Sequence, residues 1–270
     1  MQIPPLIDSI LEVSERVATL SFNRDDVRNA LTGTDLIDDI VDTVTWVNKT
    51  SDISVLIITG NGSAFSAGGN IKDMQNRQGD FLGSVAELER KYREGIQRIP
   101  LALESLEVPS IAMINGPAIG AGLDITCMCD LRVASNNATF GETFINLGII
   151  PGDGGAWFLQ KLIGYQKAAE LTFSGRVINA QEALEIGLVL NVVPHDQLEA
   201  TARELANNIA SKPPHAVRYT KRLMKKAQRM QFGDFLEVCA GFQGMSHNTL
   251  DHLEAVNAFL DKRPPSYKGK

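Results

Sequence analysis

The sequence has few cysteines and no pattern of them that suits a metal site or a disulfide framework. Its three cysteines, Cys127, Cys129 and Cys239, are odd in number and include no Cys-x-x-Cys pair. A four-ligand zinc site and a set of structural disulfides both need other numbers and spacings. We therefore interpret all three as small buried side chains.

Long apolar runs and an excess of basic residues are also missing. No stretch approaches the roughly 18 apolar residues of a membrane-spanning helix, and residues 1–5 lack the charged then apolar plan of a signal peptide. The 26 Lys and Arg against 32 Asp and Glu give a net charge of -6, the wrong sign for a protein whose main ligand is a phosphate backbone. We expect a cytoplasmic protein that binds neither membranes nor nucleic acid.

What is present is the composition of an ordinary folded enzyme. The 270 residues are 44% hydrophobic and 21% charged, which excludes disordered and low-complexity classes. Strand and helix signals alternate in the first two thirds, as in an α/β fold with a largely parallel sheet. The expected elements are a hairpin of residues 7–13 and 17–22, a helix over 34–49 capped by Thr34, buried strands at 55–60 and 110–116, and a helix from about 85 to 106.

The last third differs from the rest because strand signals nearly vanish from about residue 180. Four helical segments are predicted near residues 196–210, 214–230, 234–247 and 249–261. The sequence therefore divides into an α/β core at 1–195 and a helical C-terminal region at 196–270.

Two glycine-rich turns follow buried strands and lead toward helices, at residues 60–70 and 115–124. Small residues leave backbone N–H groups uncovered, and a helix N-terminus adds partial positive charge, so the two turns together could form an oxyanion hole. The alternative for either turn alone is a tight connection with no ligand. The spacing of Gly116, Gly120 and Gly122 is neither a dinucleotide fingerprint nor a P-loop, and all histidines lie in the last third, which leaves Ser66 without a histidine partner.

Five motifs follow one another along the chain: residues 23–31, 65–74, 114–122, 129–134 and 147–155. Their order and content resemble the crotonase family, the enoyl-CoA hydratase/isomerase superfamily. The resemblance implies a spiral of strand-strand-helix repeats followed by a C-terminal helical region that builds trimers, often paired into hexamers. It also implies an acyl-coenzyme A substrate and no metal or redox cofactor.

The resemblance places the oxyanion donors at the backbone N–H groups of Ala67 and Ala121. One such donor is worth about 3–4 kcal/mol in the transition state. It places Arg24 and Arg28 at the phosphate-bearing end of the coenzyme, although a solvated surface charge is an equal alternative for each. The remaining expected substrate contacts are Ala30, Ser66, Gly68, Gly69, Asn70, Ile71, Pro117, Gly120 and Phe144.

The acids depart from the family pattern. Asp124 occupies the first glutamate position of the hydratases, but the second falls on Phe144, which transfers no proton. Glu142 and Asp153 lie close in sequence and are the other candidates, while a helix cap or a turn carboxylate is the alternative for each acid. Because Asp124 follows Ala121 by three residues, we predict that Asp124 is the principal acid, within a few ångströms of the substrate.

A basic stripe lies outside this argument. Arg218, Lys221, Arg222, Lys225, Lys226 and Arg229 share one face of the predicted helix at 214–230, with Val217, Leu223, Met224 and Ala227 on the other. We interpret the stripe as a solvated helix face, with an RNA, a membrane surface or a coenzyme phosphate as alternative ligands.

The sequence thus predicts an enoyl-CoA hydratase-like lyase that stabilises the enolate of an acyl-CoA thioester. Asp124 would share the acid-base work with Glu142 or Asp153. Two alternatives remain open at this point: a double-bond isomerase that uses one acid, and an RNA-binding member of the family whose catalysis has decayed.

Overall fold

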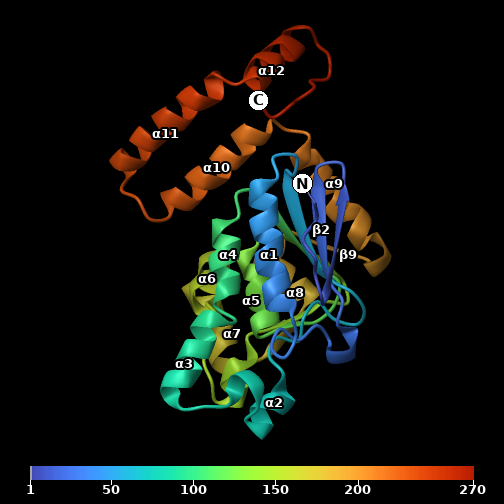
Figure 1. Ribbon diagram of the computed structural model, residues 1–270, viewed down its shortest axis with the longest axis vertical. Coiled ribbons are helices and arrows are strands. Elements are labelled where there is room, and N and C mark those ends of the chain that lie inside the picture. The colour runs from blue at the N-terminus through green and yellow to red at the C-terminus, as the bar shows by residue number, and fades with distance from the viewer. Residues whose placement is uncertain (1) are drawn as a thin grey trace.

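A six-stranded sheet runs through the core of the computed structural model, which describes residues 2–270 (Figure 1). Its order is β1-β2-β3-β4-β6-β9, with β1 and β2 antiparallel and every other pair parallel. The strands are β1 (Ser9–Ser14), β2 (Val17–Phe22), β3 (Val55–Gly60), β4 (Ser110–Ile114), β6 (Leu131–Ser135) and β9 (Asn191–Val193). A smaller sheet pairs β5 (Ala118–Ile119), β7 (Thr139–Gly141) and β8 (Val177–Asn179). The predicted hairpin and both buried strands are confirmed.

The central strands β3 and β4 of the large sheet are buried on both faces, so they are almost continuously apolar. In β3, Leu56 and Ile58 pack into the main core, whereas Val55 and Ile57 pack against the small residues of α9 (Leu198–Ala210) on the opposite face. This alternation follows from the two-residue period of a strand. The main core is covered by α1 (Leu36–Lys49), α4 (Arg98–Ser105), α5 (Ala121–Met128), α6 (Gly155–Ile163), α7 (Tyr165–Ser174) and α8 (Ala180–Glu185).

Two local predictions are wrong. The helix expected from about 85 to 106 is divided at Gly95 into α3 (Val85–Glu94) and α4, because the backbone of Gly95 leaves the helical region (φ -108°, ψ -110°). Thr34 does not cap α1, since its hydroxyl donates to the carbonyl oxygens of Ala30 and Leu31 and Asp35 precedes the helix instead.

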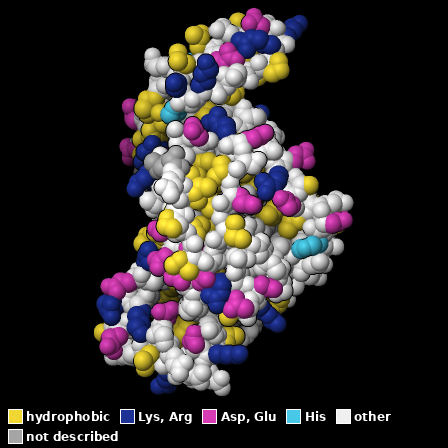
Figure 2. All heavy atoms as spheres, turned by 45° about the vertical axis from the view of Figure 1, so that its right-hand side comes forward, with side chains coloured by type: hydrophobic (Ala, Val, Ile, Leu, Met, Phe, Trp, Pro, Cys, Tyr) yellow, Lys and Arg dark blue, Asp and Glu magenta, His cyan; other side chains and the backbone are white. Residues whose placement is uncertain are grey.

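The C-terminal helices α10 (Pro214–Ala227), α11 (Phe232–His247) and α12 (Leu250–Leu260) extend away from the sheet, at the top of Figure 1. α9, which the division at residue 195 assigned to the C-terminal region, packs on the sheet with the core, and the extension begins with α10. Among residues 2–270, no helix combines the length and apolar character needed to cross a bilayer. Figure 2 shows basic and acidic side chains interspersed over the face in view.

Candidate active site

A mainly apolar pocket opens beside the two glycine turns. Its walls include Met74, Phe81, Tyr92 of α3, Phe144 and Ile149. Gly69 and Ala121 of the two glycine turns and the acidic residue Asp153 also line it. An apolar cavity with a few converging polar groups is the usual form of a small-molecule site.

The two glycine turns pack directly against each other, which brings N–H groups from both into one place. Gly68 has a φ of +76°, and a methyl group on it would lie 3.0 Å from the nitrogen of Ala121. A methyl group on Gly122 would lie 2.2 Å from the carbonyl oxygen of Ser66. Both positions therefore require glycine, one for its backbone conformation and one for the close approach.

The predicted donor at Ala67 is wrong. Its N–H donates to the carbonyl oxygen of Arg28 at 2.9 Å, which uses the hydrogen that a substrate oxygen would need. The N–H of Gly69, two residues later, and that of Ala121 donate to no acceptor within residues 2–270, and both residues line the pocket. The resemblance had pointed to Ala67, and only the backbone path of this turn shows that the free N–H belongs to Gly69.

Three carboxyl groups lie together beneath this pocket. Asp124 of α5 is 0% exposed, Glu142 after β7 is 1% exposed, and Asp153 before α6 is 4% exposed. Both oxygens of Asp124, both of Glu142 and Oδ1 of Asp153 accept no hydrogen bond from any residue that the structure describes. Buried carboxylates are normally satisfied by donors or cations, so these three form an unusual and costly cluster.

Burial is the main cause of the altered acidity of this cluster. It raises the pKa of Asp124 well above its usual range, and the neighbouring charges of Asp153 and Glu142 raise it further. Burial also raises the pKa of Glu142 to about 7 and raises that of Asp153. A carboxyl group with a pKa near neutrality exchanges protons readily at the pH of most cells, which is the property of a general acid or base.

Comparisons with known proteins agree with this geometry. The sequence profile of the family described as "Enoyl-CoA hydratase/isomerase" matches residues 12–270. The chain belongs to this family. A crotonyl-CoA hydratase of Syntrophomonas wolfei is 37% identical over 263 residues, which cover 97% of this chain and 98% of that protein. A 1,2-epoxyphenylacetyl-CoA isomerase of Escherichia coli is 30% identical over 262 residues, covering 96% and 97%.

The fold prediction is confirmed in the same way. The crystal structure of an enoyl-CoA hydratase from Bacillus anthracis superposes with a TM-score of 0.91 at 34% identity, covering 98% of this chain and all of that one. The strand-helix core and the C-terminal helices of this family member thus have the arrangement that the resemblance implied.

The structure changes the order of the candidate acids in this family member. Of the three carboxyl groups, only that of Asp153 belongs to the pocket wall, while Asp124 and Glu142 lie behind it. Asp124 is pressed against the backbone of α6, since a methyl group on Gly155 would lie 2.1 Å from its Oδ1. Phe144 packs its ring over Gly120 and faces the pocket, at the position expected to hold a second acid. The prediction that Asp124 lies closest to the substrate is therefore not supported.

The other expected substrate contacts fall into two groups. Ser66 is fully buried: its hydroxyl donates to the carbonyl oxygen of Asn29 and accepts from the N–H of Gly68, so it supports the turn and offers nothing to a ligand. Arg24 is held by Asp8 and Asp26. The other residues remain accessible to a ligand. Arg28 and Ile71 are exposed, and four are half-buried: Ala67, Gly69, Asn70 and Pro117.

Asn29 is a structural residue that the motif analysis quoted without a role. Its buried side-chain amide donates to the carbonyl oxygens of Asn61 and Ala64, and its Oδ1 accepts from the N–H of Arg24. It therefore fixes the first glycine turn to the preceding loop. Ala30 is buried beside it, and its carbonyl oxygen accepts from Thr34.

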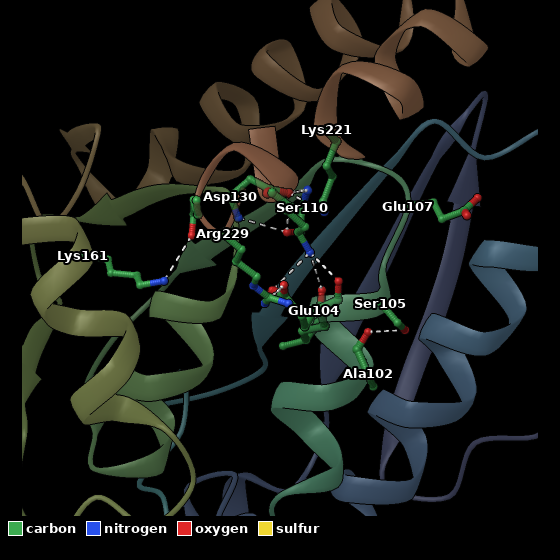
Figure 3. A network of polar contacts seen from close by, with 12 residues as sticks. Ala102, Glu104, Ser105, Glu107, Ser110, Asp130, Lys161, Lys221 and Arg229 are labelled. Carbon is green, nitrogen blue, oxygen red and sulfur yellow. Dashed lines mark hydrogen bonds and ion pairs between the residues drawn. The ribbon is translucent and has the colours of Figure 1, made fainter. Parts of the chain in front are cut away.

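Only part of the basic stripe of α10 is solvated as the sequence led us to expect. Arg218 and Lys221 are buried against the core and Lys225 is half-buried, whereas Arg222, Lys226 and Arg229 are exposed. Lys221 donates to the carbonyl oxygen of Val108 and to Asp130, each at 2.6 Å, and Arg218 donates to the carbonyl oxygens of Thr50 and Ile53. Figure 3 shows Lys221, Asp130 and Ser110 in one network, with Arg229 directed at Glu104. Met224, on the face opposite the stripe, is 67% exposed. The buried members of the stripe are thus unavailable to RNA, and only three of its six basic side chains are exposed.

Proposed function

We propose that this protein is an enoyl-CoA hydratase that works through an enolate held by the two glycine turns, with Asp153 as the acid-base group beside the substrate. The observation that carries the proposal is the position of Asp153 in the wall of an apolar pocket that also presents the unused N–H groups of Gly69 and Ala121. Every step that it requires is a hydrogen bond or a proton transfer, so we propose no metal or redox cofactor.

The thioester carbonyl oxygen would accept hydrogen bonds from Gly69 and Ala121. Negative charge grows on this oxygen as the enolate forms, and fixed N–H donors stabilise that charge more than they stabilise the neutral thioester. Ala121 is the first residue of α5, so the partial positive charge of the helix N-terminus adds to the effect. These features support a role for the pocket in enolate chemistry.

Asp153 would handle the proton during hydration. Water adds its oxygen to the β-carbon of a 2-enoyl-CoA, the proton that it loses passes to the Asp153 carboxylate, and a proton is delivered to the α-carbon of the enolate. Burial raises the pKa of Asp153, which makes its carboxyl group hold a proton more readily than an exposed aspartate does.

A double-bond isomerase is the second candidate, favoured by the aromatic ring of Phe144 at the position of the second acid. One carboxylate can move a proton between the α- and γ-carbons of an enoyl-CoA without a water nucleophile. Phe144 also makes this part of the pocket apolar, which disfavours an ordered water.

The test is turnover by the purified protein of crotonyl-CoA and of a 3-enoyl-CoA, followed by the ultraviolet absorbance of the conjugated thioester and by product mass. Hydration adds the mass of one water, whereas isomerisation leaves the mass unchanged. We expect calorimetry to detect binding of a CoA ester and none of NADH. Binding of NADH with no affinity for any CoA ester would contradict the proposal.

We also propose that the protein assembles into trimers or hexamers through its C-terminal helices. None of the side chains of α11 is buried in the chain described, and Phe259 of α12 is 83% exposed. Large apolar side chains in this number on one extension favour a protein partner surface. Light scattering should give a mass of three or six chains, and a stable monomer at micromolar concentration would contradict this assembly.

A further inference from the structure

The three buried carboxyl groups form a connected cluster behind the pocket. Asp153 lines the pocket, and Asp124 lies within hydrogen-bonding reach of the carboxyl groups of both Asp153 and Glu142. They come from three separate elements: the first turn of α5, the segment after β7 and the turn before α6. Their meeting is therefore a property of the tertiary structure.

Two carboxylate oxygens cannot hydrogen-bond to each other unless one of them carries a proton. Between residues 2 and 270, no lysine, arginine or histidine forms an ion pair with any of the three groups, and five of their six oxygens have no donor. Protons held between the carboxyl groups would both remove like-charge repulsion and supply the missing donors. The cluster is thus built to retain protons.

The groups that face the cluster do not change this conclusion. Cys127, one turn along α5 from Asp124, is buried, and burial raises the pKa of its thiol to about 12, so it stays neutral. Tyr92 of α3 faces Asp153, and burial raises the pKa of its phenol, with the charge of Asp153 adding to the effect. Neither group brings a positive charge to the carboxylates.

We propose that Asp124 and Glu142 are positioning residues that act through Asp153, as a buried proton relay behind the one acid that touches the substrate. When Asp153 takes a proton from water or from the α-carbon, it shares that proton with the Asp124 carboxylate, and Asp124 in turn shares its proton with Glu142. The reverse shift returns a proton to Asp153 for delivery to the enolate. No proton is gained or lost by the relay over one turnover. This inference rests on the proposed function for its substrate.

The relay explains how a site with one pocket-facing acid can both accept and deliver a proton. If Asp153 acted alone, the proton that it takes from water would be the only one that it could deliver to the enolate. If Asp153 shares protons with Asp124 and Glu142, it can take a proton from water while the cluster still holds another for the enolate. Gly155 supports the arrangement, because any side chain there would displace Asp124.

The test is the pH dependence of kcat/KM in three single variants of the full-length protein. In Glu142→Gln, loss of a neighbouring negative charge should move the acidic limb of the profile to lower pH by about one unit or more. In Asp124→Asn, kcat should fall about 10-fold or more with KM changed less than about 2-fold, since an amide cannot share the proton. Asp251→Asn is the matched control: Asp251 is equally buried but accepts from the N–H groups of Lys268 and Gly269, so the limb should not move.

Two outcomes separate this inference from the proposed function. If the wild type turns over an enoyl-CoA, the limb stays in place in Glu142→Gln and kcat is kept in Asp124→Asn, then Asp153 acts alone and the relay is overturned. If the wild type turns over nothing, infrared difference spectra of wild type against Glu142→Gln test the shared protons directly. A carboxylic-acid band that persists to about pH 6 and is lost in the variant supports them, and its absence rejects them.

Discussion

Two buried charged clusters of this protein meet the cost of burial in opposite ways. At α10, the buried side chains of Lys221 and Arg218 both donate hydrogen bonds to backbone carbonyl oxygens, and Lys221 also donates to the carboxylate of Asp130. Beneath the pocket, Asp124, Glu142 and Asp153 are equally buried, yet five of their six oxygens have no donor from the described chain. The first cluster attaches a helix to the core. The second leaves carboxyl groups buried without hydrogen-bond donors, which costs stability.

The difference shows which buried charges serve stability and which serve chemistry. Cations at α10 meet the carbonyl groups that helices leave unpaired at their C-termini, such as Leu103 and Glu104 at the end of α4, which accept from Lys225. A buried carboxylate cluster without such partners destabilises the folded protein. Proteins typically keep such destabilising groups only at functional sites. The following predictions test this contrast.

The largest effect on stability is expected for Lys221→Met, which leaves Asp130 and the Val108 carbonyl without their buried cation. Asp130 is partly exposed and can be solvated, so the main loss is the donor of the buried Val108 carbonyl, which typically costs about 1–3 kcal/mol. Urea unfolding at pH 7 measures this cost. Lys226→Met on the exposed face of the same helix is the control, with an expected change within about 0.5 kcal/mol. Equal effects of the two variants would show that the buried network contributes nothing.

The largest effect on activity is expected for Asp153→Asn. If Asp153 moves the proton at the substrate, kcat should fall about 100-fold or more while the fold and CoA-ester binding are kept. Steady-state kinetics, calorimetry and circular dichroism measure the three properties. A larger loss in Asp124→Asn than in Asp153→Asn would restore Asp124 as the principal acid.

A pH-dependent effect on stability is expected for Glu142→Gln. The pKa of Glu142 in the folded protein is raised to about 7 from the usual 4.5, so its contribution to stability is complete below pH 4.5 and is lost as the pH rises through 7. Removing this titration should make the variant more stable relative to wild type at pH 8 than at pH 5, by up to about 3 kcal/mol. Urea unfolding of both proteins at pH 5 and pH 8 measures this change. If the variant and the wild type differ by the same free energy of unfolding at both pH values, the raised pKa of Glu142 is contradicted.

The smallest effect is expected for Arg229→Ala at the edge of the α10 network. Its partner is Glu104, and the Arg229 side chain is largely exposed, so the ion pair should be worth less than about 1 kcal/mol and should weaken in salt. Unfolding measured at low and high salt gives the value. A cost near that of Lys221→Met would mean that burial does not govern the energy of this network.

The sequence by itself determined the order of the elements, the α/β core followed by helices, and the two glycine turns. Each of these depends on local information: a two-residue or 3.6-residue period, a buried run of β-branched residues, or a glycine where a side chain has no room. The family motifs lie on the same local segments, so the resemblance and the periodicity agreed.

The tertiary structure decided which groups of those segments face the ligand. The orientation of α10 depended on carbonyl groups of α4 and the core, which the helical period does not record. Arg218 and Lys221 are therefore buried, and Met224 is exposed. The choice of Gly69 over Ala67 depended on the carbonyl of Arg28, and that of Asp153 over Asp124 on how the turn before α6 returns over α5. All of these contacts join segments that lie far apart in the sequence. They form only when those segments pack together, so no local sequence pattern records them.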